Sequence, residues 1–134
     1  MLDSLMPVLN YLLYFGTALA LLLLSGIVYV KFTPGDEIKL IREGNVAAAL
    51  ALGGAMVGYA AVVFTAAAHN DSWIDMVMWS GISLIVQIIA CEILCFVIHD
   101  KWKEAIARGD LAHGIALGSF SLAVGLINAG CIVS

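Results

Sequence analysis

The chain has 134 residues, of which 63% are hydrophobic and only 12% are charged. This composition excludes a water-soluble globular protein, because four apolar runs of about 20 residues, each able to cross a bilayer core of about 30 Å, take up most of the length. It also argues against nucleic-acid binding, because the net charge is −4 and no clustered positive face is present. We expect an all-α polytopic membrane protein, one integral membrane domain over residues 1–134, with spans at Val8–Val30, Asn45–Ala68, Trp73–His99 and Asp110–Val133.

The first span is expected to stay in the mature protein. Residues 1–7 contain no Lys or Arg, so the positively charged start of a cleavable signal peptide is missing. All six Lys and Arg residues fall in two segments, Lys31–Arg42 and Lys101–Arg108. The positive-inside rule places both segments in the cytoplasm, which predicts that the N-terminus and the C-terminus lie outside.

The two cytoplasmic connectors are expected to form short interfacial helices. Thr33-Pro34-Gly35-Asp36 is typical of a capped helix start, and Ile38 and Ile41 then lie one turn apart among charged residues. Gly44 would end this helix and Asn45 would cap the next span, and Gly109-Asp110 repeats the arrangement. A connector that simply lies on the bilayer explains the pattern, and so does one that recruits a partner. The partner-facing candidates are Lys39, Arg42, Lys101, Lys103 and Arg108.

Small residues recur every three or four positions along the second and fourth spans. Because lipid provides little hydrophobic drive for helix association, such stripes predict close helix packing. The predicted packing residues are Ala47, Ala51, Gly54, Gly58 and Ala61 in the second span, Ala112 and Ala116 on one face of the fourth span, and Gly114, Gly118, Ser121 and Gly125 on its other face. Two such faces on one helix need neighbours on both sides, which the same chain or a homo-oligomer would provide.

The third span carries the polar residues that suit lipid least. Ser80, Ser83, Gln87 and Cys91 share one helical face, and Glu92 is the acidic group well inside a span. Counting residues from the cytoplasmic ends places Glu92 at the level of Gly53-Gly54 and of Gly118-Ser119, against which it could pack.

Three interpretations of Glu92 stay open. It could be a protonated, hydrogen-bonded packing residue, or it could belong to an ion or proton path together with Gln87 and Asn128. It could also ligate a metal with Cys95 and His99, which share its helical face, but no further ligand completes a four-coordinate site. We therefore expect no metal and no cofactor.

A shift of 65 residues aligns the two halves of the chain. The identical pairs are Ile41/Ile106, Gly44/Gly109, Ala47/Ala112, Ala51/Ala116, Leu52/Leu117 and Gly53/Gly118. Each unit, at about residues 8–68 and 73–133, contains two crossings, so the two hairpins share one orientation in a parallel repeat.

Several of these motifs together resemble the YjfL-like family of small bacterial inner-membrane proteins. They are Phe32-Thr33-Pro34, Leu40-Ile41-Arg42-Glu43-Gly44-Asn45-Val46-Ala47, Gly53-Gly54 and Asn128-Ala129-Gly130-Cys131. The resemblance covers essentially the whole chain and implies an inner-membrane location. It offers no established activity, and it implies an association with PspA-like envelope-stress components.

The sequence contains no Ser-His-Asp order, HExxH motif, P-loop or dinucleotide fingerprint, so we do not expect an enzyme. The leading hypothesis is an oligomeric scaffold or accessory subunit for envelope maintenance, embedded in the lipid bilayer as a homo-oligomer and recruiting a peripheral cytoplasmic envelope-stress protein. The alternative is a small ion or proton channel or transporter that uses a path containing Glu92.

Overall fold

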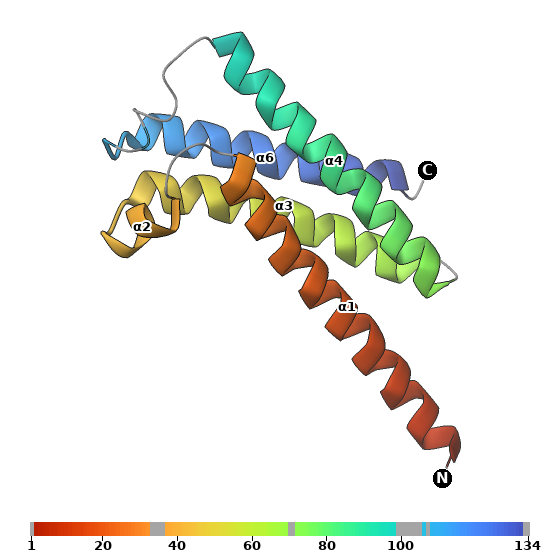
Figure 1. Cartoon of the computed structure of the whole chain (residues 1–134). Helices are drawn as coiled ribbons and strands as arrows, with labels where there is room; N and C mark the ends of the chain where they lie inside the picture. The colour runs from red at the N-terminus through yellow and green to blue at the C-terminus, as the bar shows by residue number, and fades with distance from the viewer. Residues whose placement is uncertain (1, 33–36, 70–71, 99–105, 107, 133–134) are drawn as a thin grey trace.

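The computed structural model describes residues 2–32, 37–69, 72–98, 106 and 108–132. These residues form five helices and no strand: α1 (Leu2–Phe32), α2 (Glu37–Arg42), α3 (Val46–His69), α4 (Trp73–Ile98) and α6 (Leu111–Ile132) (Figure 1). Four of them, α1, α3, α4 and α6, are long and apolar enough to cross a membrane, which confirms the all-α polytopic architecture.

The bounds of three spans agree with the expected ones to within one residue, but α1 begins at Leu2 and not at Val8. Hydropathy marks only the part of a helix that can lie in hydrocarbon. The helix itself continues through the more polar first turns, where Asp3 is favourably placed near the positive end of the helix dipole.

α3 and α6 pack backbone against backbone and run in the same direction. Ala47, at the start of α3, meets Gly114 near the start of α6, and further along Gly58 meets Ser121 and Gly125. A Cβ atom added to Gly54, Gly114, Gly118 or Gly125 would collide with the backbone of the facing helix. Because glycine has no side chain, the two helices can approach to a distance that any other residue would prevent.

α4 crosses the α3–α6 pair, and α1 contacts the bundle through only part of its length (Figure 1). Ser25, in the C-terminal half of α1, is buried, whereas residues 3–13 are all exposed. The N-terminal half of α1 therefore leaves the bundle, as Figure 1 shows.

Two turns of the same backbone shape precede α3 and α6. Gly44 and Gly109 have φ angles of 85° and 81°, a conformation that glycine adopts without strain. Their amides donate to the carbonyls of Ile41 and Ile106 at 3.0 and 2.9 Å. A duplicated unit would produce this likeness, and the duplication itself stays a prediction.

The first connector contains the helix α2, which packs on the start of the bundle. Its Leu40 and Ile41 lie against a buried cluster of Ala47, Ala48, Ala51, Ile106 and Leu117. The helix start expected at residues 33–36 and most of the second connector, including the helix expected there, lie outside the described residues.

Candidate functional site

A polar stripe on α4 faces α3 and α6. Ser80, Ser83 and Gln87 are buried and Cys91 is half-buried, as their spacing along one helical face predicts. We call this stripe, together with Tyr59 of α3 and Ser121 and Asn128 of α6, the polar junction.

Hydrogen bonds tie the polar junction to all three helices. The Tyr59 hydroxyl donates to the carbonyl of Ser80 at 2.8 Å, and Gln87 Nε2 donates to the carbonyl of Ala55 at 3.0 Å. From α6, Asn128 Nδ2 donates to the carbonyl of Ser83 at 3.3 Å. Cys91 Sγ and Ser121 Oγ lie 3.2 Å apart and share a hydrogen bond. These contacts join helices where lipid provides no hydrophobic drive.

Two atoms of the polar junction have no hydrogen-bond partner within the described chain: Gln87 Oε1 and the hydroxyl of Ser80, both buried. Leaving a buried polar atom unpaired costs about 1–3 kcal/mol, so such atoms usually hold a water molecule. The junction residues include no carboxyl or imidazole group. Gln87 and Asn128 use their amides to bind backbone carbonyls, which is a packing arrangement.

Glu92 lies apart from the polar junction. It is exposed, whereas Gln87, five residues earlier on the same helix, is buried. Five residues correspond to a rotation of about 140° around the helix. The structure therefore corrects two expectations: within one chain Glu92 shares no path with Gln87 and Asn128, and it does not pack against the small-residue stripes.

The depth of Glu92 follows from its neighbour Cys91. Cys91 contacts Ser121, which lies near the middle of α6. Glu92 is therefore close to the level of the middle of α6, although it belongs to the last third of α4. It shares a face of α4 with the exposed Ile85, Ile89 and Ile93. An acidic side chain at this depth normally faces protein or a water-filled cavity, because ionised carboxylates are costly in hydrocarbon.

No group of three or more metal-ligating side chains occurs among the described residues. Of the other ligands considered beside Glu92, Cys95 belongs to α4 but its side chain is not described, and His99 lies outside the described residues.

The predicted packing residues divide into two groups. The structure brings together the α3 stripe and one face of α6: Ala47, Ala51, Gly58, Gly114, Gly118, Ser121 and Gly125 are buried, and Gly54 and Ala61 are half-buried. Ala112 and Ala116, on the other face of α6, are exposed together with Ser119 and Ala123. We call these four residues the outer small face. Because they are exposed, the close packing expected for Ala112 and Ala116 does not occur among the described residues.

The basic connector residues that the structure describes are solvent-accessible. Lys39 and Arg42 are exposed on α2, and Arg108 is exposed beside Gly109. Lys101 and Lys103 lie outside the described residues.

Asp110 caps the start of α6, as the repeat of the Gly-Asn arrangement predicted, but its contact with His113 was not predicted. Asp110 accepts hydrogen bonds from the amide of Ala112 at 3.1 Å and from His113 Nδ1 at 2.9 Å. Partial desolvation acts to raise the pKa of Asp110. The opposite effect is larger, because Asp110 accepts a hydrogen bond from His113, lies beside its charge and accepts from the amides of Ala112 and His113. The pKa of Asp110 is therefore lowered below its usual value.

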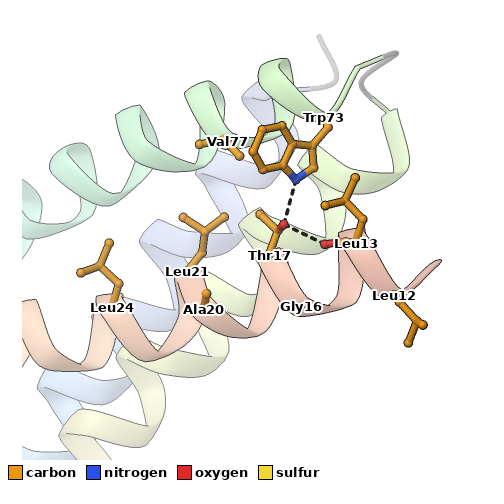
Figure 2. Close-up of a pocket in the computed structure, with 9 residues that line it drawn as sticks. All are labelled: Leu12, Leu13, Gly16, Thr17, Ala20, Leu21, Leu24, Trp73 and Val77. Atoms are coloured by element: carbon orange, nitrogen blue, oxygen red, sulfur yellow. Dashed lines mark hydrogen bonds between the residues drawn. The ribbon is translucent and has the colours of Figure 1, made fainter. Parts of the chain in front are cut away.

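A groove between α1 and α4 was also missed by the sequence analysis. Figure 2 shows that Trp73 of α4 donates through Nε1 to Thr17 Oγ1 of α1 at 2.8 Å, while Thr17 donates to the carbonyl of Leu13 at 2.7 Å. Small residues at Gly16 and Ala20 lie beside this contact. These two small residues could have indicated a close helix contact on this face of α1. They do not indicate which helix makes that contact.

Comparison with known proteins places the chain in a family. It matches the model of the Domain of Unknown Function (DUF350) over residues 1–132. It is 33% identical over 131 residues to the UPF0719 inner membrane protein YjfL of Escherichia coli strain K12, covering 98% of this chain and 96% of that protein. The protein of the same name from Escherichia coli O157:H7 is similar to the same extent. No solved structure matches the chain significantly. The expected family and the multi-pass membrane character are thereby confirmed, and the chain belongs to the DUF350 family of inner-membrane proteins, whose function is unknown.

Proposed function

We propose that this protein is an oligomeric scaffold or accessory subunit of the bacterial inner membrane, built from identical copies side by side and serving envelope maintenance. The observation that carries the proposal is the outward-facing carboxyl of Glu92 on α4, at nearly the level of the middle of α6. A single chain leaves this group facing lipid, where a carboxylate is costly. A neighbouring copy would cover it.

The outer small face of α6 is a suitable partner for this surface of α4. The Cys91–Ser121 contact fixes the relative level of the two helices. Glu92 follows Cys91 by one residue on α4, and Ser119 precedes Ser121 by two residues on α6. Both steps lead toward the side of the Gly44 and Gly109 turns, so the levels of Glu92 and Ser119 differ by one residue, or about 1.5 Å. Copies related by rotation about the membrane normal keep these levels. The Ser119 hydroxyl of one copy could then donate to Glu92 of the next.

The test is the oligomeric state in lipid nanodiscs or by single-molecule photobleaching in vesicles. Ala116→Leu, which fills the outer small face, should shift the protein toward monomers, and Glu92→Leu should weaken or change the assembly. Ala49→Leu is the matched control, because Ala49 is exposed on α3 and belongs to neither surface. A monomeric wild-type protein in lipid would contradict the proposal.

The connectors would recruit the peripheral partner. The exposed cations Lys39 and Arg42 on α2 suit an acidic surface of a cytoplasmic envelope-stress protein, by the association that the family resemblance implies. Arg42→Glu should release a co-purifying protein in mild detergent. Asp3→Lys, a charge reversal at the far end of α1, should retain it.

A second candidate function rests on the same carboxyl. If several copies enclose Glu92 between them, the group would bind a proton or cation on a path between subunits rather than within one. Flux measurements in liposomes would separate the two functions. Flux in the wild type that Glu92→Gln abolishes would favour the channel, and an absence of flux in both would favour the scaffold.

A further inference from the structure

We draw no further inference here: the strongest candidate, the exposed surface of α4 around Glu92 that faces away from the polar junction, belongs to the contact on which the proposed function already rests, and nothing in the structure shows what else covers it.

Discussion

Gly58 and Gly125 face each other across the α3–α6 contact with no room for a methyl group between them. A Cβ atom built on Gly125 would collide with the backbone of Gly58, and one built on Gly58 would collide with the backbone of Ser121. Backbone cannot move aside as a flexible side chain can. The approach of the two helices is therefore set by the absence of side chains at these positions.

Gly125→Ala should destabilise the fold by about 1–3 kcal/mol, because the helices must separate to accommodate the methyl group. The higher helix propensity of alanine, worth up to about 1 kcal/mol in an exposed helix, offsets part of this loss. Gly130→Ala on the same helix, where a Cβ meets nothing within 4 Å, should be neutral or slightly stabilising. Unfolding in mixed micelles compares the three proteins. Equal stability of both variants would show that α3 and α6 do not pack through these glycines.

Asn45 should contribute to stability through both ends of its amide. Its Oδ1 accepts from the amide of Ala48 at 3.1 Å and caps α3, and its Nδ2 donates to the carbonyl of Ile106 at 2.7 Å. Asn45→Asp keeps the cap and loses the donor, so it should cost about 0.5–1.5 kcal/mol. Asn45→Ala loses both and should cost about 1–3 kcal/mol. Denaturation in micelles gives the order, and an equal loss for the two variants would mean that the bond to Ile106 contributes nothing.

Asp110 should make the start of α6 sensitive to acid. Its pKa is lowered in the folded protein, so its contribution to stability is present above the pKa of an unfolded aspartate, about 3.9, and is lost as the pH falls through the folded value. Asp110→Asn should flatten the fall in stability below pH about 4. His113→Ala should raise the pKa of Asp110 toward its usual value, which a carboxyl NMR titration measures. An unchanged titration in His113→Ala would show that the Asp110–His113 contact does not form.

The spans could be predicted because a membrane crossing depends on length and hydropathy, which the sequence carries directly. The α3–α6 contact was partly predictable for a similar reason. Residues spaced by three and four, such as Gly114 and Gly118, must share a helical face. The sequence did not decide which of the two small faces of α6 would meet α3, because three Ala and one Ser on one face and three Gly and one Ser on the other both allow close packing. The choice depends on the other helices.

Glu92 shows where residue counting stops being sufficient. Its depth could be estimated by counting residues along α4, and the Cys91–Ser121 contact places it at a similar level. Its direction depends on the rotation of α4 about its own axis. The polar stripe determines that rotation, because burying Ser80, Ser83 and Gln87 turns Glu92 outward. The α1–α4 groove depends on the angle between two helices, for which no sequence pattern exists.

The orientation of the chain in the membrane can be tested at the two glycine turns. The hydrogen bond from Asn45 to Ile106 joins them, so they must lie on the same side of the membrane. The positive-inside rule places that side in the cytoplasm, since Arg42 and Arg108 lie next to these turns. Ser72, which is exposed before α4, should then lie outside.

A variant without its native cysteines, in which Cys91, Cys95 and Cys131 are replaced by Ser, provides the background for single-cysteine labelling. In intact cells a membrane-impermeant maleimide should label Ser72→Cys, and it should label Glu43→Cys and Arg108→Cys only after permeabilisation. The reverse pattern would invert the orientation and remove the connectors from the reach of a cytoplasmic partner. Labelling of Glu43→Cys and Arg108→Cys from opposite sides would be more serious, because the Asn45–Ile106 bond and the parallel α3–α6 pair could not then exist.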